Sequence, residues 1–169
     1  KDCALALARV REQQEYDVIG LLTTVTEDVD RISMHGVRRE LLEVQAEALQ
    51  LPLDIVYIPP SVTNKVYEQR MAAALKHHRD DGVETVIFGD MLLTDIRSYR
   101  EEQLARFGIE AHFPLWGEAT DRLVERFVEE GYKAITVCVD REQLSRQFIG
   151  RKLDKDFLDE LPDTADPCG

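Results

Sequence analysis

The chain opens with Lys1 and Asp2, a cation and a carboxylate that stand directly ahead of an amphipathic stretch with helical character. At the N-terminus of a helix, unsatisfied backbone N–H groups and the helix dipole attract anions. The start of the chain therefore has the character of a phosphate-binding turn at the head of a helix. Lys-Asp is also a common surface helix start, so this interpretation needs support from other segments.

A second candidate site is the pair Gly89-Asp90, which follows the apolar run Val86-Ile87-Phe88. Glycine has no Cβ, so the backbone at position 89 allows close approach of a ligand. Asp90 then places a carboxylate at the carboxyl edge of the predicted sheet. A plain strand-to-loop turn is the alternative interpretation.

Further candidate binding residues follow predicted strands or lie in predicted helical segments. Each also has a structural explanation: threonine suits strands, a lone histidine is more often a capping or surface residue, a tryptophan can plug the edge of a core, and charges at helix ends are often solvated. Both interpretations stay open from the residues alone. The candidates are Thr23, Thr24, Val25, His35, Asp95, Arg97, Trp116, Arg151 and Asp154.

Short apolar runs rich in β-branched residues alternate with helical stretches, which is typical of parallel βαβ units. We predict strands over residues 17–25, 53–58, 84–88, 109–114 and 134–139. Their apolar continuity predicts burial on both faces, with Cys138 as a small core residue. A parallel sheet of this kind binds its ligand beyond the carboxyl ends of its strands, where the strand order reverses.

Apolar side chains at helical spacing predict three helices that lie against the sheet. Residues 1–140 are expected to form the α/β domain, and residues 141–169 an incomplete helical C-terminal extension that covers the site, with helical pieces near 142–148 and 155–161. The apolar positions are Val37, Leu41, Val44 and Ala48, then Tyr67, Met71, Ala74, Leu75 and His78, and finally Leu123, Val124, Phe127 and Val128.

Composition restricts the function. The 21 basic against 33 acidic residues leave a formal charge of -12, which disfavours general binding to nucleic acid or to anionic membranes. Three cysteines without C-x-x-C spacing suggest neither a disulfide framework nor a thiolate zinc site. No apolar run approaches the roughly 18 residues of a membrane span. We expect a soluble cytoplasmic protein, with a homodimer as an open possibility.

Several segments, in this order, resemble the diphthine–ammonia ligase family of PP-loop ATP pyrophosphatases. The resemblance covers nearly all of the 169 residues. In that family the motif Ser-Gly-Gly-Lys-Asp-Ser follows a strand and precedes the first helix; this chain has Lys1-Asp2, with Cys3 in place of the last serine. We therefore expect the chain to be trimmed at both ends. The segments are Lys1-Asp2, residues 34–37 leading into 39–46, residues 86–90, Pro114-Leu115-Trp116, and residues 148–154 running to Asp166-Pro167-Cys168-Gly169.

The resemblance implies a Rossmann-like fold of the PP-loop type, a three-layer parallel sheet with helices on both faces, and an ATP site. It implies that Lys1 contacts the ATP phosphates, that Asp2 holds or orients Mg²⁺, and that Asp90, beside Gly89, meets ribose or Mg²⁺. Lys1, Asp2 and Asp90 are the predicted catalytic residues. The other predicted ATP-binding residues are Cys3, Thr23, Thr24, Val25 and His35.

The weaker candidates concern the second substrate. Arg97, with Asp95 beside it, is a possible phosphate contact. By the resemblance, the motif around Arg151 and Asp154 faces the cleft and handles the acceptor or pyrophosphate. Trp116 lines an acceptor pocket or plugs the core.

The implied reaction is ATP-dependent amide formation. An acceptor carboxylate, on a small molecule or a protein, attacks the α-phosphorus and releases pyrophosphate; ammonia then displaces AMP. A non-catalytic adenine-nucleotide-binding module is the first alternative, because Cys3 replaces the motif serine. A sulfur- or amide-transfer enzyme that acts on RNA is a remoter one, disfavoured by the acidic charge balance.

Overall fold

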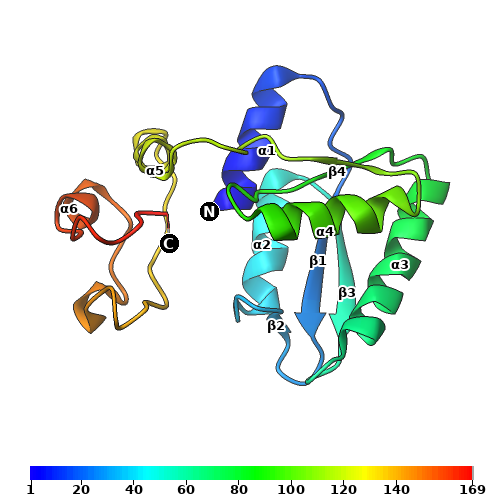
Figure 1. Ribbon diagram of the computed structural model, residues 1–169, viewed down its shortest axis with the longest axis horizontal. Coiled ribbons are helices and arrows are strands. Elements are labelled where there is room, and N and C mark those ends of the chain that lie inside the picture. The colour runs from blue at the N-terminus through cyan, green and yellow to red at the C-terminus, as the bar shows by residue number, and fades with distance from the viewer. Residues whose placement is uncertain (169) are drawn as a thin grey trace. The chain divides into compact units, whose positions relative to one another are not determined.

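The computed structural model describes residues 1–168 of the chain. Helices and strands alternate along most of it, as Figure 1 shows. In chain order the elements are α1 (Asp2–Gln13), β1 (Leu21–Thr26), β2 (Arg31–Ile32), α2 (Arg39–Leu49), β3 (Leu53–Ile58), α3 (Asn64–Asp80), β4 (Thr85–Ile87), α4 (Thr94–Ala105), β5 (Glu110–His112), α5 (Thr120–Glu129), the 3-10 turn η1 (Arg146–Phe148) and α6 (Lys155–Asp159).

The chain forms two compact units, and each is described by itself. The terminal unit comprises residues 1–9, 87–94 and the chain from residue 113 onward; the sheet unit comprises residues 10–86 and 95–112. The division into domains at residue 140 stays a prediction.

The sheet unit contains a three-stranded sheet of order β2-β1-β3. β1 pairs in parallel with β3 along its whole length, from Leu21 opposite Leu53 to Thr26 opposite Ile58. Its last two residues also pair antiparallel with β2. Val25, at the centre of this arrangement, is fully buried. The parallel arrangement that the βαβ pattern predicts is confirmed for β1 and β3.

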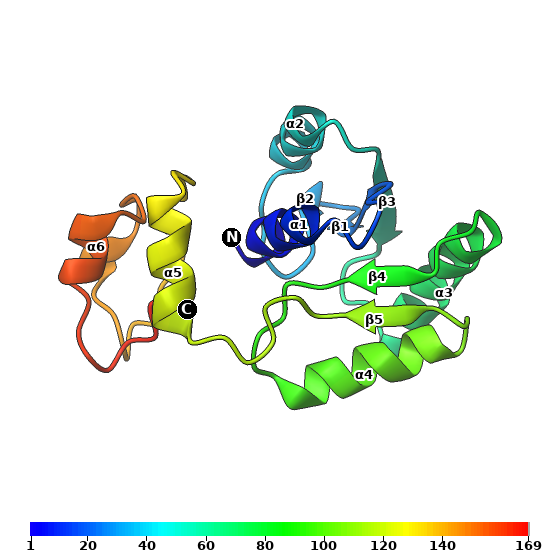
Figure 2. The same cartoon turned by 90° about the horizontal axis from the view of Figure 1, so that it is seen from above.

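β4 and β5 form a separate two-stranded sheet. Figure 2 shows their arrows pointing the same way, with α4 as the crossover between them. The backbone N–H of Glu110 donates to the Glu84 carbonyl at 2.8 Å, just before β4 begins. The mixed α/β class is therefore confirmed, and the described strands form two small sheets.

α3 packs against β3 as predicted, because Leu75 is buried and Met71, Ala74 and His78 are half-buried. The Thr63 hydroxyl caps this helix by accepting from the Val66 N–H.

The apolar positions predicted to face inward on α2 are displaced by about one residue from those that do. Leu41 and Val44 are 46% and 61% exposed, whereas Ala46 is buried. The inward positions are Leu42, Ala46 and Leu49, which also follow helical spacing. The adjacent residues Leu41 and Leu42 each fit a helical repeat of apolar positions. The sequence pattern favoured the repeat that contains Leu41, which faces solvent.

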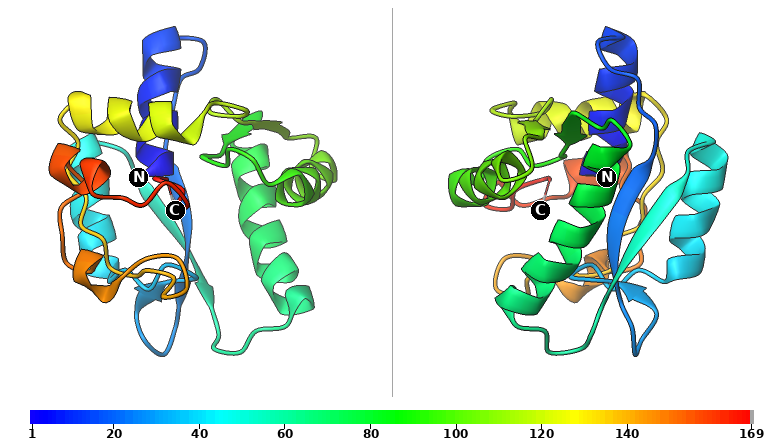
Figure 3. Two further views of the ribbon diagram at one scale, coloured as in Figure 1. Left: turned by 60° about the vertical axis from the view of Figure 1, so that its left-hand side comes forward. Right: turned by 90° about the vertical axis from the view of Figure 1, so that its right-hand side faces the viewer.

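The core of the terminal unit joins α1 to α5. Leu5 and Ala6 of α1 pack with Leu115, and with Leu123 and Phe127 of α5, and all five are buried. The apolar face predicted for α5 is buried, but it packs on α1 and Leu115, whereas the sequence predicts packing against the sheet. Figure 3 shows both chain termini within this unit.

The predicted strand over residues 134–139 is wrong. Ile135 is 59% and Val137 72% exposed, and Cys138 is exposed as well, contrary to its predicted burial. The backbone of Ala134 and Thr136 instead bonds to residues 150–153, including the Thr136 N–H to the Arg151 carbonyl at 3.0 Å. The segment thus has a local partner on one side and belongs to neither sheet.

The helical pieces predicted after residue 141 are shorter than expected, since the described part of that segment forms only η1 and the five-residue α6. None of the described helices has the length and apolar character needed to cross a membrane.

Candidate functional site

The first turn of α1 holds Lys1 and Asp2 side by side in the terminal unit. The Lys1 carbonyl accepts from the N–H groups of Ala4, at 3.0 Å, and Leu5, at 3.2 Å, and so starts the helix. The Lys1 ammonium is paired with the Asp2 carboxylate, and the two side chains are 16% and 39% exposed. A mostly covered cation therefore lies beside a more accessible carboxylate at a helix N-terminus, where anions are favoured.

Gly89 lies against this first turn. A Cβ placed on Gly89 would come within 2.7 Å of the Asp2 carbonyl carbon and of the Cys3 backbone nitrogen. The sequence predicts that a ligand approaches Gly89 closely; in the structure the backbone of α1 occupies that place. The helix start and the end of the β4 segment are in direct contact, within one unit.

Asp90 follows Gly89 and is half-buried. The next residue, Met91, accepts from the Gly117 N–H through its carbonyl at 3.0 Å. Two loops of the terminal unit are therefore fixed to each other directly beside Asp90. Lys1, Asp2, Cys3, Gly89 and Asp90 are the predicted site residues that this unit brings together.

Cys168 packs against the core cluster of the terminal unit, which contains Leu5 of α1. Its thiol donates to the Thr120 carbonyl at 3.2 Å, and its backbone N–H donates to the Asp166 carboxylate at 2.8 Å. Burial raises the pKa of the Cys168 thiol, and the nearby Lys1 charge opposes that rise. In the sequence, Asp166-Pro167-Cys168 forms part of a motif, but the motif predicts no role for Cys168.

Trp116 belongs to an aromatic cluster. It meets Phe113 edge-on at 5.9 Å between ring centroids, and Phe113 stacks on Phe88 at 5.3 Å. Phe113 is buried and Trp116 half-buried. This packing supports the structural interpretation of Trp116 as a plug beside the core.

Arg151 and Asp154 are held by contacts of their own near the C-terminus. The Arg151 guanidinium binds both carboxylate oxygens of Glu160, at 2.6 and 3.1 Å, and lies over the rings of Phe148 and Phe157. The Asp154 carboxylate caps α6 by accepting from the Phe157 N–H at 3.0 Å. A role for either residue toward acceptor or pyrophosphate stays a prediction.

The residues predicted to bind adenine belong to the sheet unit. Thr23 and Thr24 are half-buried in β1, and the Thr24 carbonyl accepts from the Ser33 N–H at 2.9 Å. The side chain of Val25 is buried in the core, which leaves only its backbone for a ligand. His35 is exposed in the turn after β2, beside Met34 with a positive φ of 71°.

Asp95 and Arg97 lie in the first turns of α4, also in the sheet unit. Arg97 forms an ion pair with Glu101, one helical turn on, at 2.7 Å. Such exposed pairs contribute little to stability.

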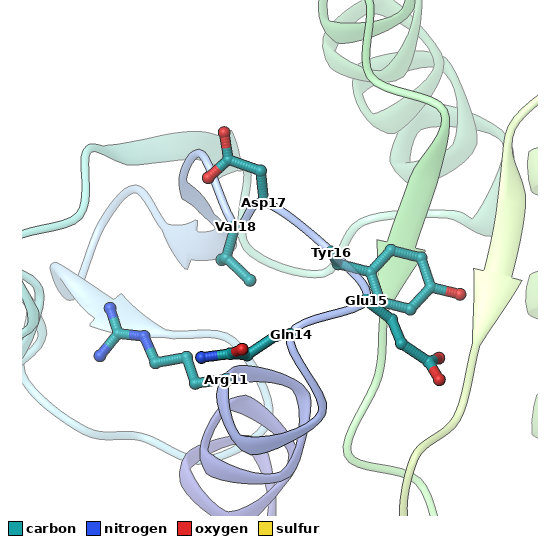
Figure 4. A pocket seen from close by; sticks show the side chains of 6 residues that line it. All are labelled: Arg11, Gln14, Glu15, Tyr16, Asp17 and Val18. Atoms are coloured by element: carbon teal, nitrogen blue, oxygen red, sulfur yellow. The ribbon is translucent and has the colours of Figure 1, made fainter.

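One cavity of the sheet unit has a volume of about 470 Å³ and contains no predicted site residue. It is formed by one continuous segment, and Figure 4 shows Glu15 and Tyr16 pointing away from Arg11. The Tyr16 ring contacts the His112 ring, at 5.0 Å between centroids. The polar groups that line the cavity do not point toward a common centre, so the cavity is a poor ligand site. The lining residues are Arg11, Gln14, Glu15, Tyr16, Asp17 and Val18.

The chain matches a known family over its first two thirds. The family model described as Diphthamide synthase N-terminal domain matches residues 1–111. The matched range contains Lys1, Asp2, Gly89 and Asp90, and it ends before Trp116 and the C-terminal motifs. No curated protein matches the chain.

Proposed function

The chain belongs to the diphthamide synthase N-terminal domain family, and from this premise we propose that it is an ATP-dependent amide ligase. The reaction consumes a carboxylate, ammonia and ATP, and it releases AMP and pyrophosphate. One observation of the structure carries the proposal furthest: the backbone contact between Gly89 and Asp2 that brings the Gly89-Asp90 segment to the start of α1.

Charge neutralisation is the main task of such a site, because adenylation moves negative charge among phosphate oxygens and needs no covalent enzyme intermediate. The Lys1 ammonium provides a full positive charge. The N–H groups of the first turn of α1 add partial positive charge from a direction that the helix fixes. Lys1 is proposed to bind the phosphates and to stabilise the pyrophosphate as it leaves.

Magnesium fits this arrangement as a companion of ATP. The described residues contain no cluster of three or more acidic, histidine or cysteine side chains that could hold a metal ion. Mg²⁺ bound with a nucleotide usually takes only one or two protein carboxylates together with phosphate oxygens. Asp2, whose side chain is 39% exposed, would supply one of them, and Mg²⁺ would withdraw charge from the phosphates.

The chemical steps follow from this placement. The acceptor carboxylate forms a bond to the α-phosphorus while the bond to the pyrophosphate oxygen breaks, which gives an acyl-adenylate. Ammonia then attacks the acyl carbon, AMP leaves with the electron pair of the broken bond, and one proton is released from nitrogen. Asp90 is proposed to orient the ribose, so that the α-phosphorus faces the acceptor.

Adenine is proposed to bind along β1, through backbone groups of Thr23, Thr24 and Val25 with His35 at the edge. Arg97, Arg151 and Asp154 are secondary proposals for phosphate or acceptor contacts. The acceptor is a carboxylate on a small molecule or on a protein, with diphthine as the specific candidate that the family description suggests.

Calorimetric titration with Mg-ATP tests the binding step. The unmodified protein is expected to bind, and Asp90→Asn is expected to weaken binding at least about tenfold, since a hydrogen bond to a charged group contributes about 1.5–3 kcal/mol. Asp28→Asn, at an exposed position of the sheet unit, is the matched control. Absence of binding to the folded, unmodified protein would refute the proposal.

Product analysis separates catalysis from binding. Acceptor-dependent release of AMP and pyrophosphate, with ammonia incorporated into the product, supports the ligase. Tight binding without any AMP formation, over a panel of carboxylate acceptors that includes a diphthine-bearing protein, favours the non-catalytic nucleotide-binding module.

A further inference from the structure

The chain after α5 forms an open strand edge. The Thr136 N–H donates to the Arg151 carbonyl at 3.0 Å, and the Thr136 carbonyl accepts from the Gly150 N–H at 2.8 Å. Both backbone groups of Thr136 therefore point toward the neighbouring segment. In an extended strand the backbone groups of adjacent residues point the opposite way, so those of Ile135 and Val137 point outward. Within the described part of the chain, no backbone hydrogen bond involves either residue.

One face of this strand packs on the core, and the other faces solvent. Ala134 and Leu153 pack against the core cluster of the terminal unit. Ile135 and Val137, on the opposite face, are 59% and 72% exposed. An apolar run as continuous as residues 134–139 is typical of a strand buried on both faces. The sequence is therefore more apolar than this exposed face requires, which favours a surface that is covered in a complex.

The surroundings of this edge are basic in an otherwise acidic chain. Residues 133–155 contain six basic and three acidic residues, a formal charge of +3, whereas the whole chain has a formal charge of -12. Lys133 is exposed two positions before Ile135, and Lys152 is exposed directly opposite Ile135, so both lie on the outer face. Neither lysine is ion-paired to a residue that the structure describes. Charges farther away than about 8 Å are largely screened at physiological salt, so these local cations favour an acidic partner.

We propose that this edge binds an extended, acidic segment of a partner protein by addition of a β-strand. The segment hydrogen-bonds to the outward backbone groups of Ile135 and Val137, as strands added to a sheet edge do. Its apolar side chains cover those of Ile135 and Val137, and its carboxylates pair with Lys133 and neutralise Lys152. The edge lies beyond residues 1–111 that the family model matches, and the proposal does not depend on the ATP site.

A solvated edge is the alternative. Proteins often place lysine on an exposed edge to prevent pairing with other strands, and Lys133 would then only guard against association. A second copy of the chain is a poorer occupant, because it presents the same cations and carries a formal charge of -12. The guarding role predicts that no strand binds, whereas the binding role predicts that an acidic strand binds and a basic one does not.

A labelled peptide tests the binding. The probe is a fluorescein-labelled nonapeptide of alternating glutamate and valine, and fluorescence anisotropy measures its affinity. One control peptide has lysine in place of glutamate, and another carries N-methyl groups on alternate amides, which removes the hydrogen bonds of one edge. The acidic peptide is expected to bind, and both controls at least about tenfold more weakly. Absence of saturable binding up to about 1 mM acidic peptide would overturn the proposal.

Amide hydrogen exchange locates the bound peptide. In the free protein the Thr136 and Leu153 amides are expected to exchange more slowly than those of Ile135 and Val137, because only the first two donate to carbonyls. Saturating acidic peptide is expected to slow exchange at Ile135 and Val137 at least about tenfold. Binding that leaves these two amides unprotected would place the peptide elsewhere and reject this edge as the site.

Matched variants test the side chains. Lys133→Glu and Lys65→Glu change the net charge equally, and Lys65 is an exposed residue of α3 in the sheet unit. Lys133→Glu is expected to weaken peptide binding about fivefold, because a repulsive cross-strand pair replaces an attractive one, and Lys65→Glu by less than about twofold. Val137→Ser should weaken binding, while Val29→Ser, at a position 58% exposed, should not. Thermal melts verify folding. Equal effects within each matched pair would overturn the proposal.

Sedimentation velocity tests the second copy as the occupant. The protein is expected to sediment as a monomer without peptide. If it forms a dimer instead, and protection of Ile135 and Val137 rises with protein concentration alone, the edge pairs with itself and the acidic partner is rejected. Failure to bind Mg-ATP would refute the proposed function and leave each of these results unchanged.

Discussion

Gly89 and Asp2 lie so close that no side chain fits at position 89, because a Cβ there would be 2.7 Å from the Asp2 carbonyl carbon. Contacts of this length involve backbone on both sides, so neither partner yields by rotating a side chain. The start of α1 is thereby positioned by the segment that follows β4.

Gly89→Ala is therefore expected to move or loosen the first turn of α1. Insertion of one carbon into a closely packed place typically costs about 1–3 kcal/mol in the free energy of unfolding. Mg-ATP affinity should fall as well, since Lys1 moves with the turn. Urea denaturation and calorimetry measure the two effects.

Gly20→Ala is the graded control for that experiment. A Cβ at position 20 would meet the Pro52 carbonyl oxygen at 3.3 Å, and Gly20 has no positive φ. Its cost should be clearly smaller, with Mg-ATP affinity retained. If Gly89→Ala were tolerated as well as Gly20→Ala, the close contact would not control the site.

The helix-capping role of Asp154 can be tested separately from the negative charge of its side chain. Its carboxylate caps α6 at the Phe157 N–H. Asp154→Ala should lower the free energy of unfolding by about 1 kcal/mol, whereas Asp154→Asn should keep most of it, because asparagine caps helices as well as aspartate does. Chemical denaturation measures both.

Turnover of the same variants then tests the predicted contact of Asp154 with the acceptor or pyrophosphate. A loss of kcat/KM in the stable asparagine variant would show that the negative charge is needed. Full turnover in Asp154→Asn would leave Asp154 with the capping role alone.

The paired charges of Arg151 and Glu160 make a pH prediction. The hydrogen bond from Arg151 lowers the pKa of Glu160 below its ordinary value of 4.5. A carboxyl group with a depressed pKa in the folded state adds stability above its unfolded pKa, and that stability is lost as the pH falls through the folded value. The difference in Tm between the unmodified protein and Glu160→Gln should therefore be present at pH 7 and shrink below about pH 4.5.

Glu129→Gln is the control for that series, since Glu129 is an exposed residue at the end of α5. Its Tm difference should stay small and nearly independent of pH. A Tm difference for Glu160→Gln that stayed undiminished from pH 7 to pH 3 would contradict the assigned pairing.

Local patterns in the sequence predicted local structure well. The apolar runs around Val25 and Val56 predicted the two strands that pair in parallel, and the spacing of Leu123 and Phe127 predicted the buried face of α5. In both cases the apolar residues of the pattern are those that the fold buries. The same reasoning failed at α2, where Leu41 and Leu42 support two phases equally and only the packing partner selects one.

Contacts between distant segments were beyond the sequence pattern. The sequence predicts that Gly89 and Asp90 face a ligand, yet a Cβ on Gly89 would meet the backbone of Asp2 and Cys3. The sequence predicts no role for Cys168, because nothing in a single sequence indicates that residue 168 packs against the core cluster that contains Leu5. A family resemblance supplied the order of the motifs, and only the structure supplied this contact.

Two valines test the corrected description of residues 134–139. Val25 is fully buried in β1, whereas Val137 is 72% exposed although it lies in an equally apolar run. Val25→Ala should lower the free energy of unfolding by about 2 kcal/mol, from the lost apolar burial and the cavity left behind. Val137→Ala should change it by less than about 0.5 kcal/mol, as exposed substitutions usually do. Urea denaturation of both variants measures the difference. A cost at Val137 equal to that at Val25 would restore the buried strand that the sequence pattern predicts and contradict the exposed segment of the structure.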